Sequence, residues 1–417
     1  MKRIVCSAFL ALCLFCGVHA APVRASQSIT DTVLLQNTLS APAVNVKING
    51  LSPYFTYAPY IADGSTMIPA RTVMENLGCT VGWEGETKTV KVSTTGKTIS
   101  LTIGKSEITV NGTKKSIPAP AVLVGDVTYI PLRAVSEALD ATVSWDNKTK
   151  TAGICSYEKT HTLSVGGHTL MLGQTMDALY ASCGEPTYSV PGENGLTWHV
   201  YASSPASFFA AGADGGILCA YYTNAPGFFT SDGYAYGATA PSDGRQYEYL
   251  HSGHANFHRY YDTIEKKLCA VYAIFDGYYN LHDIHTTLAG EARMGLDILN
   301  TFRYANGLAP LYWDEAAAEC SKTHAEYMAS IGELTHTGAD GSSAIMRYHA
   351  YRPDFRWTAW GENICAEAKN IFTCINGWRN SSAHRSLMLS DKLYAGIGLV
   401  YVPGGKYSYC AAMLLLK

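Results

Sequence analysis

The sequence is poor in charged residues. Only 16% of its 417 residues are Asp, Glu, Lys or Arg, against about 25% in an average soluble chain. Lys and Arg number 31 and Asp and Glu 34, which gives a formal net charge of −3. Without an excess of basic residues to neutralise phosphates, nucleic-acid binding is disfavoured. Apolar residues make up 47% of the chain, which is near the globular average and argues against intrinsic disorder.

Long apolar runs are also scarce, which excludes a polytopic membrane protein. The exception is Ile4 to Gly17, which follows Lys2 and Arg3 and precedes the small-residue stretch Val18-His19-Ala20. A charged start, a short apolar core and an A-x-A-like site predict a secretory signal peptide over residues 1–20. We therefore expect a secreted, extracellular mature chain with no transmembrane segment. Residues 21–44 are interpreted as a linker.

Closely spaced cysteines are missing after the predicted signal peptide. Of the 12 cysteines, three lie in the predicted signal peptide, and the other nine include no C-x-x-C pair. This disfavours a zinc ribbon or a redox dithiol. Because nine is an odd number, at least one thiol is expected to be free or to pair between chains. Most are interpreted as small buried hydrophobes, and one or two disulfides are left open.

What the sequence does contain is an internal repeat. Several residues recur at a constant separation of 62 positions. The recurring pairs include Asn49-Gly50 and Asn111-Gly112, Pro69-x-Arg71 and Pro131-x-Arg133, Glu75 and Glu137, and Trp83 and Trp145. The constant separation predicts two structural copies within residues 45–154.

Each copy is predicted to hold a strand that ends at Asn-Gly, a short helix opened by proline and a Val-x-Trp strand. The helices are expected over Arg71–Leu77 and Arg133–Leu139. The arginine and glutamate of each helix are interpreted as an ion pair that fixes the helix on the sheet, with a ligand clamp as the alternative.

This pattern resembles the tandem module called the copper amine oxidase N-terminal, or stalk, domain, which is common on secreted Gram-positive proteins. The resemblance implies an extracellular spacer or adhesion module rather than a catalyst. Residues 24–159 contain no histidine, so no copper site is predicted.

Residues 160–280 read as an α+β middle domain. Thr175 is expected to cap a helix of about nine residues that Gly184 and Pro186 end. Strands are expected at residues 197–201 and 216–222. Together these elements resemble the CAP-associated domain that precedes the CAP domain in many Gram-positive secreted proteins.

Three histidines of this segment could share one helical face with a carboxylate. His251, His254 and His258 are spaced i, i+3, i+7, and Glu248 lies three residues before the first. On a helix these four side chains could bind zinc. Because Ser252-Gly253 interrupts the stretch, a role on the surface or in the core is preferred.

From residue 288 the pattern becomes helical. Helices are expected over residues 288–305, over Glu315–Ile331 behind an Asp314 cap, and over Ile371–Trp378, with closing strands at Ala395–Tyr401 and Tyr407–Leu416. A set of short motifs occurs in order: Leu311-x-Trp313-Asp314, His336, Gly361-Glu362-Asn363, Trp378, Ser381-x-x-His384-Arg385 and Gly396-Ile397-Gly398.

This ordered set resembles the CAP superfamily of cysteine-rich secretory, antigen 5 and pathogenesis-related proteins, over residues 288–417. The resemblance implies an α-β-α sandwich with a central cleft. The expected fold class is thus an α+β multidomain chain, with a β-rich duplicated N-terminal module, an α+β middle domain and this C-terminal sandwich.

The cleft of that family carries two histidines and two acidic residues. The resemblance places His336, Glu362 and His384 at three of these positions, and Ser381 stands where eukaryotic members have the second glutamate. Two imidazoles and a carboxylate are a ligand set for a divalent metal, so Zn²⁺ or another divalent ion is expected to bind weakly. The alternative is that His336 and Glu362 form a hydrogen-bonded pair that ties two loops to the core.

The preferred function is that of a non-enzymatic extracellular protein that binds a ligand or a cell-surface component such as the cell wall. The alternative is a metal-assisted, protease-like hydrolase that uses His336, Glu362 and His384. Against it, no second carboxylate is identifiable as a general base, and no Ser-His-Asp set is evident. A third hypothesis is a purely structural surface protein.

Overall fold

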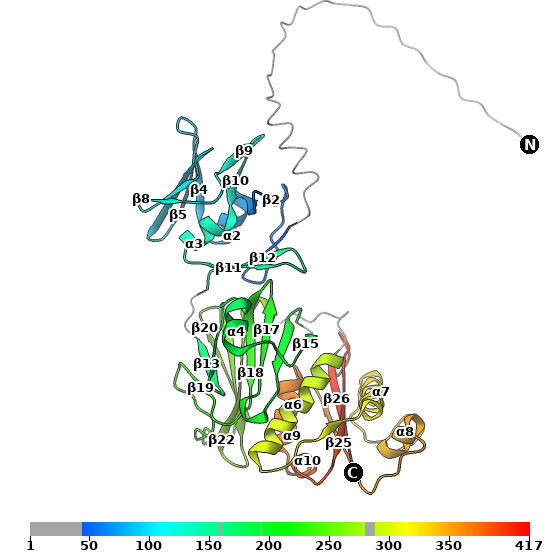
Figure 1. The fold of residues 1–417 in the computed structure, drawn as a ribbon. Coiled ribbons are helices and arrows are strands. Elements are labelled where there is room, and N and C mark those ends of the chain that lie inside the picture. The colour runs from blue at the N-terminus through cyan, green and yellow to red at the C-terminus, as the bar shows by residue number, and fades with distance from the viewer. Residues whose placement is uncertain (1–43, 158–160, 193, 280–287) are drawn as a thin grey trace, which may run out of the picture. The chain divides into compact units, whose positions relative to one another are not determined.

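The computed structural model describes residues 44–157, 161–192, 194–279 and 288–417 (Figure 1). The predicted signal peptide and almost all of the predicted linker lie outside these residues. Within them, none of the helices is both long and apolar enough to cross a membrane.

Residues 44–157 build three small sheets and two short helices. The strand orders are β4-β5-β6-β7-β8, β2-β3-β10-β9 and β1-β12-β11. The strands are β1 (Asn45–Ile48), β2 (Tyr60–Ala62), β3 (Ser65–Pro69), β4 (Thr80–Glu84), β5 (Thr89–Thr94), β6 (Lys97–Thr102), β7 (Glu107–Val110), β8 (Thr113–Ser116), β9 (Val122–Val124), β10 (Val127–Pro131), β11 (Thr142–Asp146) and β12 (Thr151–Cys155).

The two proline-opened helices form as predicted. α2 (Ala70–Asn76) begins after Pro69, and α3 (Leu132–Ala138) begins after Pro131. Proline is tolerated there because the first N–H groups of a helix have no intrahelical partner. Each helix is held by fully buried apolar side chains, with Val73 and Val135 at equivalent positions.

The expected role of the helix ion pair is wrong. In α2 the Nη1 atom of Arg71 lies 3.1 Å from Oε1 of Glu75, but the two side chains are 67% and 50% exposed. The pair lies within one helix and in solvent, where such pairs contribute little. Apolar burial, and not this ion pair, holds the helix on its sheet.

The two copies meet symmetrically in the four-stranded sheet. β3 pairs antiparallel with β10, and Ile68 lies opposite Ile130, its own counterpart in the repeat. On either side of this pair, Met67 lies opposite Pro131 and Pro69 opposite Tyr129. The outer strands β2 and β9 are counterparts as well. The sheet therefore has a local two-fold axis between the two isoleucines.

Residues 161–279 form a large sheet, a small sheet and three short helical segments. The strand orders are β15-β16-β17-β18-β22-β21-β20 and β14-β13-β19. The strands are β13 (Thr162–Val165), β14 (His168–Met171), β15 (Tyr188–Pro191), β16 (Thr197–Tyr201), β17 (Phe209–Asp214), β18 (Ile217–Thr223), β19 (Phe229–Thr230), β20 (Tyr247–Ser252), β21 (Ala255–Asp262) and β22 (Lys267–Phe275). The helices are α4 (Met176–Cys183), the 3₁₀ turn η1 (Pro205–Ser207) and α5 (Asp276–Tyr279).

The cap of α4 is the predicted one. Oγ1 of Thr175 accepts a hydrogen bond of 3.2 Å from the backbone N–H of Ala178, which satisfies one of the free donors of the first turn. Gly184 ends the helix with a φ of 76°, a conformation that favours glycine.

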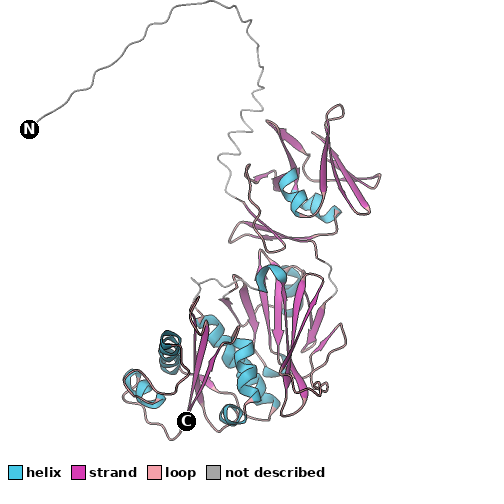
Figure 2. Ribbon diagram, turned by 180° about the vertical axis from the view of Figure 1, so that it is seen from behind, coloured by secondary structure: helices cyan, strands magenta, loops and turns pink. Residues whose placement is uncertain are grey.

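Residues 288–417 build a four-stranded sheet with helices on both sides (Figure 2). The strand order is β23-β25-β26-β24. The strands are β23 (Tyr312–Trp313), β24 (Trp360–Ala366), β25 (Tyr394–Tyr401) and β26 (Tyr409–Leu416). The helices are α6 (Ala289–Ala305), α7 (Glu315–Ile331), α8 (Ala344–Tyr351), α9 (Ile371–Asn380) and α10 (Ser382–Met388).

The alternation of side chains along β25 separates the two helical layers. The side chain of Ile397 meets α6 at Gly295, whereas Gly396 and Gly398 lie against the backbone of α7. A Cβ atom on Gly398 would lie 1.9 Å from the Lys322 nitrogen. The Gly-Ile-Gly motif therefore lets α7 approach the sheet with no side chain between them.

Helix α8 is not among the helices expected from the sequence. The helix begins after Ser343 and buries Ala344 and Tyr348. Its two tyrosines and its histidine are modest helix formers, so the local sequence gives a weak helix signal, and the burial of Ala344 and Tyr348 decides. The chain after α9 forms a separate helix, α10, which is also absent from the helices expected from the sequence.

The described residues contain nine cysteines. Seven of them are buried, which confirms the interpretation of most cysteines as small hydrophobes. The disulfides that were left open do not form within this part of the chain.

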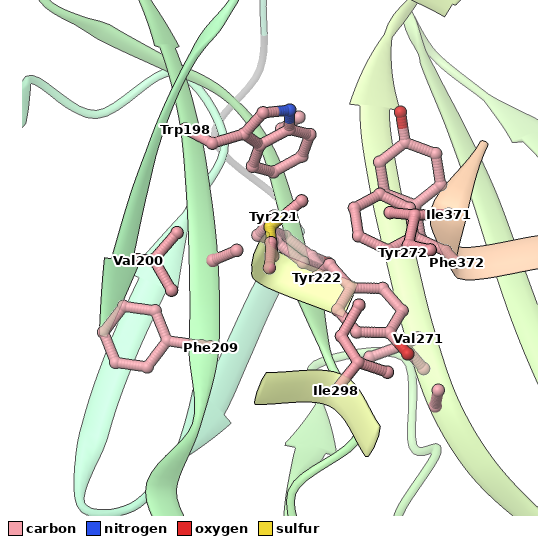
Figure 3. Packing of buried hydrophobic residues seen from close by; sticks show 14 of the residues in the cluster. Trp198, Val200, Phe209, Tyr221, Tyr222, Val271, Tyr272, Ile298, Ile371 and Phe372 are labelled. Atoms are coloured by element: carbon pink, nitrogen blue, oxygen red, sulfur yellow. The ribbon is translucent and has the colours of Figure 1, made fainter. Parts of the chain in front are cut away.

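One hydrophobic core joins residues 161–279 to residues 288–417. It includes buried side chains of the large sheet and of α6 and α9. Figure 3 shows Phe372 of α9 among Tyr222, Tyr272 and Trp198. The rings of Phe372 and Tyr222 are stacked, with centroids 4.1 Å apart and an interplanar angle of 8°.

Polar contacts strengthen the same contact surface. Nη1 of Arg385 on α10 lies 2.7 Å from Oδ2 of Asp262, and the two side chains are 10% and 1% exposed. Oδ1 of Asn380 accepts a bond of 2.7 Å from the backbone N–H of Thr263. Since these segments share one core, neither is expected to fold independently of the other.

The shared core predicts a large effect of truncating Phe372. We expect Phe372→Ala to lower the free energy of unfolding by about 3–5 kcal/mol, the usual cost of removing a buried aromatic ring. The measurement is chemical denaturation of the full chain. Phe229→Ala is the matched control, because Phe229 is 56% exposed. Equal stability of the two variants would contradict the shared core.

Candidate functional site

The centre of the candidate site is the carboxylate of Glu362 on β24. Its side chain is only 3% exposed. Oε1 accepts a bond of 2.6 Å from Nη2 of Arg347, and Oε2 lies 2.8 Å from Nδ1 of His336. A buried carboxylate is costly unless it is paired and hydrogen-bonded. Both of its oxygens have such partners here.

Arg347 is the residue of this site that the sequence did not reveal. It lies on α8, and Nη1 donates to the backbone carbonyls of His336 at 3.0 Å and Ser342 at 2.9 Å. One guanidinium thus joins β24, α8 and the loop that precedes α8. No local motif marks this arginine, because its role depends on a helix that was not predicted.

His336 combines a held ring with an exposed surface. Its side chain is 59% exposed, while Nδ1 faces the carboxylate of Glu362. If Nδ1 carries the proton and donates it to Glu362, Nε2 presents its lone pair as a metal ligand or a base. A carboxylate that orients a histidine in this way is a common support for a metal ligand.

His384 lies near this pair, on α10. Burial lowers the pKa of His384, and the proximity of His336 lowers it further. The imidazole is therefore biased towards the neutral form, which is the form that binds metals. Nδ2 of Asn363 donates to the backbone carbonyl of His384 at 3.2 Å and so connects β24 with α10.

Ser381 lies at a helix end, and His324 lies in the buried core. Ser381 ends α9 and precedes the first residue of α10. His324 is fully buried on α7, and its Nε2 lies 2.7 Å from the carbonyl of Thr335. Burial lowers the pKa of His324, as expected for a core histidine rather than a ligand.

The expected ligand set is only partly available for a metal. In the stretches that the structure describes, no three His, Cys, Asp or Glu side chains are grouped so that they could hold an ion. Glu362 uses both oxygens on Arg347 and His336, so it supports a ligand rather than acting as one. The residues that fit a metal are the imidazoles of His336 and His384, with the remaining positions left to water.

The histidines of the middle segment do not share a helical face. They lie on or between the antiparallel strands β20 and β21, because alternating tyrosines and a Ser-Gly turn favour a hairpin. Nε2 of His251 lies 3.1 Å from Asp276, His254 stacks on Tyr157, and His258 is buried. Glu248 pairs with Arg259 at 2.8 Å. The zinc hypothesis for this segment is therefore wrong.

Comparison with known proteins agrees with the resemblances to the copper amine oxidase N-terminal domain and to the CAP superfamily. Residues 296–414 match the family model of the cysteine-rich secretory protein family, the CAP domain. Residues 47–154 match the model of the copper amine oxidase N-terminal domain. The chain therefore carries a CAP domain and a copper amine oxidase N-terminal domain.

Individual relatives are more distant. An uncharacterized membrane protein, YlbC, of Bacillus subtilis is 33% identical over 105 residues, which is 25% of this chain and 30% of that protein's length. An extracellular protein containing an SCP domain from Bacillus anthracis has a TM-score of 0.48 and 18% identity, and covers 59% of this chain and 93% of its own. A cysteine-rich secretory protein from Staphylococcus aureus has a TM-score of 0.43 and 17% identity, with the same coverage.

Removal of the charge of Glu362 is expected to destabilise the chain. In Glu362→Gln the guanidinium of Arg347, whose side chain is 12% exposed, loses its ion-pair partner. We expect a loss of about 3 kcal/mol in the free energy of unfolding, measured by thermal and chemical denaturation. Glu326→Gln on the exposed surface of α7 is the control and is expected to change stability little. An unchanged stability of Glu362→Gln would show that the pair is not buried in solution.

Because His258 is buried, we expect the free energy of unfolding to fall in acid. Burial is the main cause that lowers its pKa from 6.5 to about 4. The unfolded state therefore takes up this proton first as the pH falls from 6.5 towards 4, and folding is disfavoured by up to about 3 kcal/mol over this window. Replacing His258 with Phe should flatten this part of the curve of unfolding free energy against pH. An equally steep curve in the variant would exclude His258 as its origin.

Proposed function

We propose that this protein, which carries a CAP domain and a copper amine oxidase N-terminal domain, is a secreted extracellular ligand-binding protein of a Gram-positive bacterium. The proposal divides the chain into a signal peptide (1–20), a linker (21–44), a stalk-like module (45–154), a CAP-associated segment (160–280) and a CAP domain (288–417). The stalk-like module spaces or holds the protein at the cell surface, and a cell-wall component is the proposed partner.

The observation that carries the proposal is the exposed imidazole of His336 held by a buried carboxylate. A purely structural ion pair between Arg347 and Glu362 does not need a histidine that is 59% exposed. A ring that is fixed at one nitrogen and accessible elsewhere suits contact with a ligand.

A divalent metal is part of this proposal. His336 and His384 would bind it, and Glu362 would fix the orientation of His336. When bound, the ion would polarise a ligand oxygen or a water molecule. Two protein ligands give weak binding compared with the three or four ligands of established zinc sites.

The second candidate function is a metal-assisted hydrolase that uses His336, Glu362 and His384. Its support is the neutral bias of His384 beside His336, which would allow one of them to act as a base. Glu362 does not serve as a general base here, because both oxygens are engaged. For this reason binding is preferred over catalysis.

The test is a zinc titration of the full chain by calorimetry. We expect binding in the micromolar range, lost in the double variant His336→Ala with His384→Ala, because these imidazoles are the proposed ligands. His251→Ala is the matched control, since this histidine is also exposed and lies beside a carboxylate.

Unchanged zinc binding in the double variant would overturn the metal assignment. Hydrolysis of peptide or ester substrates by the wild-type chain, lost in either single histidine variant, would favour the hydrolase. The full chain is required in both assays, because residues 288–417 share their core with the preceding segment.

A further inference from the structure

The N-terminal module contains a groove of about 570 Å³. It is lined by the loop before β2, by α2 and the strands β4 and β5 of the first copy, and by the hairpin β9–β10 of the second copy. Its volume lies in the range of about 300–1,000 Å³ that ligand sites occupy. Its described lining residues do not include His336, Glu362 or His384, so the groove is separate from the candidate site of the CAP domain.

Two aromatic side chains of this groove are open to solvent. Tyr57, in the loop before β2, is 54% exposed, and Trp83 on β4 is 46% exposed. Leu123 on β9 lines the same groove and is 40% exposed. A single exposed apolar side chain is ordinary, whereas several that gather around one hollow mark a binding site.

The second copy of the repeat shows what the fold itself requires at these positions. The counterpart of Tyr57, 62 positions further on, is Ala119, which is 4% exposed. Trp145, the counterpart of Trp83, is half-buried and packs against the core of the module. Since both copies form the same elements, folding alone does not account for the two exposed rings of the first copy.

The uncharged polar side chains of the groove carry hydroxyl groups. Thr56, Thr72 and Thr128 belong to the lining, and Tyr57 adds its phenol group. A hydroxyl group both donates and accepts hydrogen bonds, as the hydroxyl groups of a sugar do. The apolar C–H face of a sugar ring stacks on an aromatic side chain, while the hydroxyl groups at its edge need polar partners. The lining offers both kinds of contact.

The charges of the groove disfavour an anionic ligand. Among the described residues that line it, the charged side chains are those of Arg71 and Asp126. Nη1 of Arg71 lies 3.1 Å from Oε1 of Glu75, so this cation already has a partner. Asp126 would repel a phosphate or a carboxylate. An uncharged ligand meets neither obstacle.

We propose that this groove binds an uncharged glycan, a chain of β-1,4-linked N-acetylhexosamines, through stacking of sugar rings on Tyr57 and Trp83. The inference rests on the proposed function in one respect, the attachment of the N-terminal module to the cell wall, and it names the glycan as the wall component that is bound. Proline-rich peptides also dock in aromatic-lined grooves, but the hydroxyl-rich lining favours a glycan.

The probe is the uncharged tetramer of β-1,4-linked N-acetylglucosamine, titrated into the full chain by calorimetry. We expect Tyr57→Ala and Trp83→Ala each to weaken binding at least about tenfold, because each removes a ring on which a sugar stacks. Tyr57→Ala should fold normally, since the second copy has alanine at this position. Tyr54→Ala is the matched control, because Tyr54 lies in the same loop, is 86% exposed and is not among the described lining residues.

The remaining outcomes separate this site from other modes of binding. No binding of the tetramer by the wild type, or equal binding by Tyr57→Ala, would overturn the proposal. Tighter binding of a proline-rich peptide, weakened by the same two variants, would assign the groove to a peptide and overturn it as well. The double variant His336→Ala with His384→Ala should bind the tetramer as the wild type does.

Retention on purified cell wall distinguishes a failure of this inference from a failure of the proposed function. Retention of the wild type that is weakened in Tyr57→Ala supports both. Equal retention of the wild type and Tyr57→Ala leaves the attachment to the wall intact but overturns the groove as its site. Tyr54→Ala should be retained as the wild type is.

Discussion

The stacking of Phe372 against the aromatic side chains of the large sheet is the contact on which the rest of the C-terminal half depends. Phe372 and Trp378 lie on the same helix, α9. Nε1 of Trp378 donates to the carbonyl of Ile364 on β24 at 2.9 Å. β24 in turn carries Glu362, which fixes His336 and Arg347. The position of the candidate site is therefore coupled to a sheet that contributes no residue to it.

Much of the local structure could be predicted because its causes are local. Prolines at Pro69 and Pro131 and the caps at Thr175 and Asp314 determine where helices begin, and the sequence contains each of them in plain form. The internal repeat was also visible, since a constant spacing needs no knowledge of the fold. The mixed α+β character of the chain followed from these elements.

The candidate site was predictable only in part. The resemblance identified His336 and Glu362, and the structure places them in contact. Arg347 was missed, because its importance comes from the burial of Glu362 and not from its own neighbours in the sequence. The histidines around His254 take the preferred surface and core roles, and the alternative of one helical face arose because spacing alone does not distinguish a helix from a hairpin. The core that joins residues 161–279 to residues 288–417 could not be predicted either, because it brings together residues more than a hundred positions apart.

The paired glycines of β25 explain how two different surfaces arise on one strand. A Cβ atom on Gly396 would lie 2.1 Å from the nitrogen of Ala318, so only glycine allows α7 to lie this close. The close approach fills one face of β25 with helix backbone. Ile397 fills the opposite face against α6. Helices therefore cover both faces of this strand.

The symmetric pairing of Ile68 with Ile130 gives the N-terminal module the geometry of a homodimer contained in one chain. In a true homodimer the two halves separate when the protein is diluted. Here the connecting residues keep the halves at a high effective concentration, so their association no longer depends on how much protein is present. The duplication also allows the two halves to differ in sequence, since a substitution in one copy is not repeated in the other. The module can thus remain assembled at dilutions where separate copies would dissociate, and each half can change on its own.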